Sequence, residues 1–388
     1  MKNQILSGYS DRCALSPPGS RDPLCAYKAR FQFSMSSHAL PFVHIESPPF
    51  FSNNITQLYP PSFSSGNISY PWYYTHRDNI FPNVSDKLAS LLGNVLSYWI
   101  TSSFYYTLDI SNWKWVERYR LQESEEAKAK NLVSKLEVLR IVVLQQLMQT
   151  VFGYVWMTFI DAPSFPSSSS SPSSLPISDH VAGLWSVYKF VERVCFSIFG
   201  TQQYGQHLCM TYGVSLTYTI YWWIIPIIQM LLAFFILDTY EYFLHRTFHE
   251  IKFLYKHFHS IHHRLHAPYA FGAMYGHPFE SAVLDGLGAT LAHTLVGLTD
   301  RQAILFFALA SYKTVDDHCG YNFPWHPVHR FFGNSAEYHD IHHQRAGIKS
   351  NYSQPVFIHW DVIMGTRMTK AELLAKKDRA KVHTQKME

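Results

Sequence analysis

Residues 225–263 read IPIIQMLLAFFILDTYEYFLHRTFHEIKFLYKHFHSIHH. The apolar part of this stretch belongs to a longer apolar segment that runs from Val214 to Leu237. A helix of about 20 apolar residues crosses a bilayer, so this segment is long enough to span one. Two histidine motifs, HRTFH and HSIHH, follow it closely. The stretch therefore predicts a membrane-spanning helix with a histidine cluster at its end.

Other apolar segments indicate further membrane helices. Leu88–Leu108 and Val138–Ile160 are also long enough to cross a bilayer. Ala282–Val315 is interrupted by the polar residues 299–301, which suits a tight membrane hairpin, although a helix pair buried in a soluble core is an alternative. Charged residues make up only 15% of the chain, against about a quarter in most soluble proteins. We expect an all-α integral membrane protein with about four membrane-embedded helical segments or hairpins.

The charges of the loops predict the orientation, because Lys and Arg accumulate on the cytoplasmic side of a membrane. The connection after the first span contains seven basic residues: Lys114, Arg118, Arg120, Lys128, Lys130, Lys135 and Arg140. Residues 161–213 contain only two, Lys189 and Arg193. Three glycosylation sequons begin at Asn54, Asn67 and Asn83, which suits a lumenal N-terminal segment. The histidine-rich region should then lie at the cytoplasmic face.

We divide the chain into four parts. We expect residues 1–85 to form a polar, irregular lumenal segment and residues 86–213 to hold two transmembrane helices and a Ser/Pro-rich lumenal loop. Residues 214–368 should form the histidine-rich domain and residues 369–388 a cytoplasmic tail. The formal charge is only +4 and the basic residues form no stripe interleaved with aromatics, so a nucleic-acid partner is not expected. The five cysteines contain no C-x-x-C pair, which argues against a zinc ribbon.

Histidines are concentrated in one part of the chain. Of the 22 histidines, 15 fall between His245 and His343. Eight of them form three spaced motifs: His245 and His249; His259, His262 and His263; and His339, His342 and His343. Residues three and four apart share a face of an α-helix, so we expect each motif to direct its imidazoles to one point. A surface or packed position is the alternative for any single histidine.

Imidazole is a ligand for zinc, iron, copper and nickel. Eight convergent imidazoles exceed what one ion can use, so two metal ions are predicted. Zinc sites usually close at four ligands or keep one place for water, so a nitrogen-rich site for two metals fits a redox centre at least as well. His277, in YGHPFE, and His318, in VDDHCGY, lie between the motifs and are further candidate ligands.

At these motifs the chain resembles the fatty acid hydroxylase superfamily of membrane di-iron enzymes, whose signature is H-x-x-x-H, H-x-x-H-H, H-x-x-H-H. Three stretches are similar to the sphinganine C4-hydroxylase (sphingolipid C4-monooxygenase) family in particular. They are FLYKHFHSIHHRLHAPYAFGAMYGHPFE (253–280), KTVDDHCGY (313–321) and YHDIHHQRAGIKSNYSQPVFIHWDVIMGTRM (338–368).

The resemblance implies a di-iron oxidoreductase that uses O2 and electrons from NADH, delivered through cytochrome b5 and its reductase. It implies hydroxylation at C4 of a long-chain sphingoid lipid, sphinganine or dihydroceramide, to give phytosphingosine or phytoceramide in sphingolipid biosynthesis. It also implies a multi-pass protein of the endoplasmic reticulum membrane, in which the eight motif histidines are the catalytic metal ligands.

Three alternatives stay open. A sterol or fatty-acyl oxidase or desaturase would keep the superfamily but change the substrate. A zinc-dependent membrane hydrolase would use a metal-bound water and usually a carboxylate base, and the chain contains no H-E-x-x-H motif. A non-catalytic metal-binding membrane protein would be expected to lose the ligand spacing, whereas all eight motif histidines are present.

Overall fold

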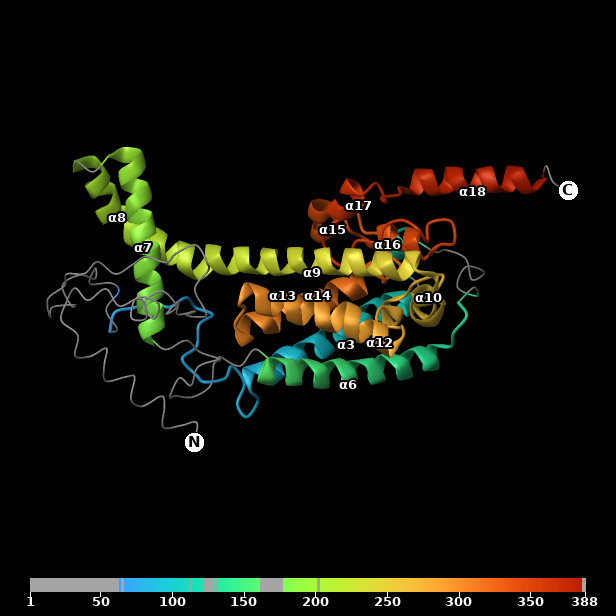
Figure 1. Cartoon of the computed structure of the whole chain (residues 1–388), viewed down its shortest axis with the longest axis horizontal. Coiled ribbons are helices and arrows are strands. Elements are labelled where there is room, and N and C mark those ends of the chain that lie inside the picture. Colours follow the sequence, from blue (N-terminus) through green and yellow to red (C-terminus); the bar gives the residue numbers. More distant parts are fainter. Residues whose placement is uncertain are drawn as a thin grey trace, which may run out of the picture. The chain divides into compact units, whose positions relative to one another are not determined.

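The computed structural model describes residues 63, 66–111, 113–121, 129, 131–160, 177–200 and 203–385, and their regular structure is helical (Figure 1). The helices are α3 (Asp86–Ser111), α4 (Lys114–Glu117), α6 (Lys135–Phe159), α7 (Ile177–Phe199), α8 (Gln203–Thr219), η3 (Ile220–Ile224), α9 (Ile225–Glu250), α10 (Lys252–Leu254), η4 (Tyr255–His259), α11 (Ser260–His262), η5 (Ala270–Gly272), α12 (Pro278–Ser281), η6 (Ala282–Leu287), α13 (Gly288–Val296), α14 (Asp300–Asp317), α15 (Pro327–Phe332), α16 (Ala336–His343), α17 (His359–Ile363) and α18 (Lys370–Gln385). The all-α prediction is confirmed for this part of the chain.

Within the described residues, two helices are long and apolar enough to cross a membrane. One is α6, and the other is the continuous helix Tyr204–Glu250, which joins α8, η3 and α9. They contain the predicted spans Val138–Ile160, apart from its last residue, and Val214–Leu237. The predicted span Leu88–Leu108 lies within α3, which is helical but less apolar. Four membrane-embedded segments therefore remain a prediction.

The long helices expose apolar side chains in rows. Residues three or four apart on one helix share a face, so such rows form continuous apolar stripes. The exposed rows are Leu92, Leu96, Ile100 and Phe104 on α3; Leu144, Leu147, Val151 and Val155 on α6; and Ile228, Leu231, Leu232 and Phe235 on α9. Extended apolar faces of this kind are rare on soluble monomers and suit contact with lipid.

The stretch predicted as a membrane hairpin forms η6, α13 and α14, and a turn at residues 297–299 separates the last two helices. The helix α14 packs along α3, while α13 packs against α9 (Figure 1). The place of this stretch in a membrane stays a prediction. Gly297 ends α13 in the left-handed region, at φ 67°. Thr299 begins α14 with a capping box, in which its side chain accepts from the Gln302 N–H and the Gln302 side chain accepts from the Thr299 N–H. The turn falls where polar residues interrupt the apolar segment.

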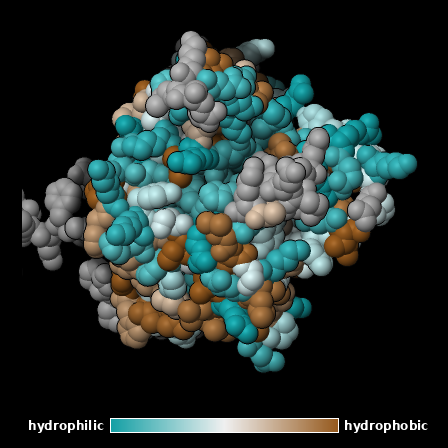
Figure 2. Space-filling model, turned by 90° about the vertical axis from the view of Figure 1, so that its right-hand side faces the viewer, coloured by the Kyte–Doolittle hydropathy of each residue, from teal (hydrophilic) through white to brown (hydrophobic). Residues whose placement is uncertain are grey.

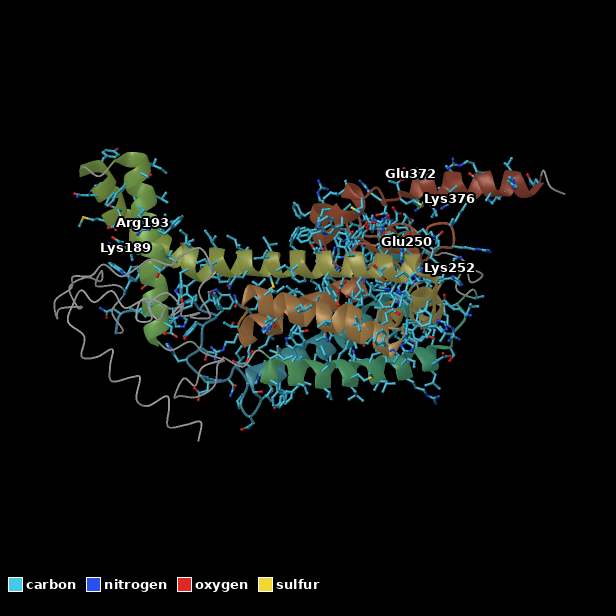
Figure 3. The ribbon with its side chains drawn as sticks, in the orientation of Figure 1. Lys189, Arg193, Glu250, Lys252, Glu372 and Lys376 are labelled. Carbon is cyan, nitrogen blue, oxygen red and sulfur yellow. The ribbon has the colours of Figure 1, made fainter. Side chains whose placement is uncertain are left out.

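Charged side chains mark both ends of α9. In Figure 3, Glu250 and Lys252 lie at its C-terminal end, on the same side of the view as Glu372 and Lys376 of α18. Lys189 and Arg193, on α7, lie toward the opposite end. Figure 2 shows the face at the C-terminal end of α9, which is mostly hydrophilic, with hydrophobic side chains gathered along its lower part. The histidines lie near this end of the helix.

Candidate metal centre

Five histidines direct their ring nitrogens to one point, and we call them the five-histidine group. They are His245 and His249 from α9, His259 and His263 from the segment that follows, and His342 from α16. The Nε2 atom of His249 lies 2.7 Å from that of His259, 3.2 Å from those of His245 and His263, and 3.1 Å from that of His342. All five side chains are buried.

Four histidines form a second set, the four-histidine group: His262, His318, His339 and His343. The Nε2 atom of His339 lies 3.0 Å from those of His318 and His343, and that of His318 lies 3.5 Å from that of His262. The two groups are adjacent, because the ring centroids of His263 and His343 are 4.8 Å apart.

Each H-x-x-H-H motif is divided between the two groups. His259 and His263 belong to the five-histidine group and His262 to the other, whereas His339 and His343 belong to the four-histidine group and His342 to the five-histidine group. The expectation that each motif points to one place was wrong for these two motifs, whereas His245 and His249 of the first motif do lie in one group. Residues i and i+4 are offset by about 40° around a helix, but i+3 is offset by about 60° in the opposite direction.

Backbone carbonyls orient most of the rings. A carbonyl only accepts, so each of these histidines carries its proton on Nδ1 and keeps the Nε2 lone pair for a metal. The contacts, at 2.7–2.8 Å, are His245 to Tyr352 O, His262 to Tyr275 O, His318 to Thr314 O, His342 to Ser350 O and His343 to Leu265 O. The Thr314 carbonyl is local, four residues before His318 on α14, whereas the other four carbonyls come from loops. Most of the tautomers therefore depend on the tertiary structure.

The geometry and charge fit two metal ions. Neighbouring lone pairs repel unless a cation lies between them, and two nitrogens about 2.0–2.1 Å from one ion lie about 2.9–3.4 Å apart at ordinary ligand angles. The observed separations of 2.7–3.5 Å are close to this range. Burial lowers the pKa of His262, His263 and His343, and it lowers that of His318 to about 3. These imidazoles are neutral near pH 7, the state that binds metal.

Glu280 is a site residue that the sequence reasoning missed. One of its carboxylate oxygens pairs with Nδ1 of His259, and both side chains are buried. A carboxylate behind a ligating histidine orients the ring and increases its basicity. The sequence signal for Glu280 was the acid of YGHPFE, three residues after His277. The sequence analysis predicted the histidine of this stretch as a metal ligand and did not consider the acid.

His277 lies outside both groups. Its Nδ1 accepts from the Phe279 N–H and caps α12, while its ring packs against Phe258. Of the acids beside the ligands, Asp340 accepts from Gln344 and Asp317 pairs with Lys313. The ring-orienting acid of the centre is therefore Glu280, which comes from a different segment.

Asp361 organises the loop whose carbonyls hold His245 and His342. It accepts hydrogen bonds from the backbone N–H groups of Tyr352 and Ser353 at 3.1 and 2.7 Å. The hydroxyls of Tyr338 and Thr366 also donate to it, at 2.8 and 2.6 Å. The Asp361 side chain is fully buried. It therefore fixes the position of the Tyr352 carbonyl without contacting a ligand.

A third set of ionisable groups has a different character. His329 and Tyr105 both donate to Asp316 at 2.6 Å, and the Tyr312 hydroxyl pairs with His326 at 2.9 Å. Each of these nitrogens already has an oxygen partner, whereas the nitrogens of the two histidine groups face one another. This set links α3, α14 and α15 as a polar contact.

Comparisons with known proteins agree with this geometry. The family model of fatty acid hydroxylases matches residues 230–366. The sphingolipid C4-hydroxylase of Schizosaccharomyces pombe is 38% identical over 76% of this chain and 93% of its own length. This chain belongs to the fatty acid hydroxylase family. The matched residues contain all nine histidines of the two groups.

Two further relatives are similar over comparable lengths. Sphinganine C4-monooxygenase 1 of Arabidopsis thaliana is 36% identical over 74% of this chain and 89% of its own length. A very-long-chain aldehyde decarbonylase of Oryza sativa is 34% identical over 74% of this chain and 90% of its own. No solved structure matches the chain.

Proposed function

We propose that this protein hydroxylates C4 of sphinganine or dihydroceramide and so forms phytosphingosine or phytoceramide in sphingolipid biosynthesis. The observation that carries the proposal is the pair of buried histidine groups, whose free ring nitrogens form two adjacent metal-binding points. The similarity to sphingolipid C4-hydroxylases extends well beyond the metal motifs, over about three quarters of the chain, which supports the substrate class.

Two iron ions are the proposed cofactors. The five-histidine group would hold one ion and the four-histidine group the other. Bound there, iron would supply the activation of dioxygen that an unactivated C–H bond requires and that side chains alone do not provide. The chain's own contribution is to hold the imidazoles neutral, orient them through carbonyls and Glu280, and exclude water by burial. Electrons would come from NADH through cytochrome b5 and its reductase.

The proposed location is the endoplasmic reticulum membrane, with several spans and a cytoplasmic metal centre. The apolar stripes on α3, α6 and α9 support contact with lipid, and the hydrophilic face in Figure 2 supports a centre near the water boundary. We also propose that the chain divides into the four parts expected from the sequence, which end at residues 85, 213, 368 and 388. The protein that donates electrons would approach the metal centre from the side on which the C-terminal end of α9 lies.

A second candidate is chemistry on a very-long-chain aldehyde, which the name of the rice relative supports. The same metal groups could serve either reaction, so the lipid product decides between them. Cells that lack 4-hydroxylated bases should regain them when the protein is expressed, and the added oxygen should come from labelled O2. A change in aldehydes or alkanes without new 4-hydroxylated bases would favour the second candidate, and label from water would contradict an oxygenase.

A further inference from the structure

A cavity of about 80 Å³ lies within the helical bundle, between α3, α6, α9, η6, α13 and α14. A single bound water needs about 10–15 Å³ by a comparable measure, so the cavity has room for several groups of that size. Its wall is unusual for the interior of an apolar bundle, because two carboxylic acids face it, Glu241 from α9 and Asp285 from η6.

The cavity begins about one helical turn from both histidine groups. Glu241 precedes His245 by four residues on α9, and Thr314 precedes His318 by four residues at the end of α14. Four residues of α-helix rise about 6 Å and return to nearly the same face. Two residues that line the cavity therefore lie about one helical turn from a histidine of each group.

The ionisable side chains of the described wall are acidic, and amide side chains bond to both of them: Gln354 to Glu241 and Gln149 to Asp285. Glu241 is 6% exposed, and the charged neighbours that act on it are Asp285, Asp238 and Asp317. The described lining contains no Lys or Arg. Lys313, on the same helix as Thr314, is paired with Asp317. Carboxylates in a low-dielectric interior attract a cation far more strongly than they would in water.

Ser311 gives an independent sign of a missing partner. Ser311 is one of the lining residues, it is 2% exposed, and its Oγ makes no hydrogen bond to a described residue. Thr290 and Thr314, which also line the cavity, donate to backbone carbonyls of their own segments. Buried hydroxyls almost always have a partner, so Ser311 is available to a ligand's polar atom.

We propose that this cavity binds the protonated amine and neighbouring hydroxyl of a free sphingoid base, with Glu241 and Asp285 on the ammonium and Ser311 on a hydroxyl. The inference rests on the proposed function and adds that the free base is preferred over its N-acylated form. An amide nitrogen carries no charge, and its acyl chain would have to fit against the two acids. The amine lies three bonds from C4, about 4 Å, which matches a cavity one turn from the metals.

The test uses the full-length, iron-loaded protein in lipid nanodiscs, with sphinganine and N-acetylsphinganine as substrates. The wild type should show a KM at least about tenfold lower for sphinganine. In E241Q, D285N and the double variant, the KM for sphinganine should rise about tenfold or more, while kcat and the KM for N-acetylsphinganine change less than about threefold. S311A should have a smaller effect of the same kind, and E192Q on α7 is the control.

Equal losses of kcat with both substrates would overturn the proposal, because the acids would then act in proton transfer. A lower KM for N-acetylsphinganine in the wild type would also overturn it. If the double variant does not accumulate, E241Q and S311A alone decide the matter.

Equilibrium binding of labelled sphinganine without NADH separates this inference from the proposed function. Binding that E241Q weakens, in a protein that forms no 4-hydroxylated product, would refute the function and support the cavity assignment. Normal turnover of sphinganine with unchanged binding in E241Q and D285N would refute the cavity assignment alone.

Discussion

The Nε2 atoms of His249 and His342 lie 3.1 Å apart, although 93 residues separate them in the chain. His249 is near the end of α9, and His342 is near the end of α16. The contact joins the long apolar helix to the last histidine motif and closes the five-histidine group.

Replacing one histidine in each group should remove one metal ion at a time. Iron-loaded wild type should contain about two equivalents per chain, and H342A and H318A should each contain about one, because the two residues belong to different groups. Hydroxylation should fall at least about 100-fold in both variants. H257A is the matched control, since His257 is exposed. Elemental analysis that gave one equivalent in the wild type would contradict the two-ion assignment.

Removal of the carboxylate behind His259 should weaken metal retention. Partners of this kind typically change metal affinity or activity about 10–100-fold, so E280Q should lose iron to a chelator faster while it folds normally. E337Q is the control, because Glu337 pairs with Lys370 at the surface. Equal rates of iron loss in E280Q and wild type would show that His259 does not need its acid.

Asp361 should matter for both stability and metal binding, because four donors lose their acceptor in D361A. Leaving such groups buried and unpaired costs about 3 kcal/mol or more. We expect a lower Tm, measured by thermal unfolding of the purified protein, and iron loss from the group that contains His245. D361N keeps one side-chain oxygen that can accept hydrogen bonds. Its Tm and iron content should therefore lie between those of D361A and the wild type. An unchanged Tm and full iron content in D361A would show that Asp361 does not organise this loop.

Acid should release the metals. The pKa of His318 falls from 6.5 to about 3 because the residue is buried and lies near other imidazoles. Between these values the unfolded chain binds a proton that the folded chain does not, so the free energy of unfolding decreases as the pH drops below about 6.5. Protons also compete with metal for Nε2. Iron release, followed with a coloured chelator, should rise between about pH 6 and pH 4, and a flat profile would contradict this.

The orientation predicts glycans before α3. Asn67 and Asn83 are exposed, whereas Asn351, which begins another sequon, is fully buried and donates to Tyr338 O and Met368 O. Asn54 lies outside the described residues. Glycosidase should shift the gel mobility of the wild type but not of a triple Asn→Gln variant at 54, 67 and 83. A glycan on a sequon engineered into α18 would place the tail in the lumen and overturn the orientation.

The sequence by itself determined the helical class, two apolar spans and eight of the nine clustered histidines, together with His318 as a further ligand candidate. These features are local. Apolar run length decides whether a helix can cross a membrane, and H-x-x-x-H spacing brings imidazoles onto one side of a turn. The hairpin at residues 297–299 was also local, because Gly297 and the Thr299 capping box end one helix and begin the next.

Only the tertiary structure decided how the histidines are shared. Helix spacing separates the i+3 histidine of each H-x-x-H-H motif from the other two, but which histidines of the other segments each side meets depends on where α9, α14 and α16 lie. Only the structure shows that Glu280 meets His259 while His277 caps α12. Most of the ring tautomers likewise depend on carbonyls from loops, such as that of Tyr352. Local spacing fixes which side chains share a helix face, whereas packing between helices fixes what that face meets.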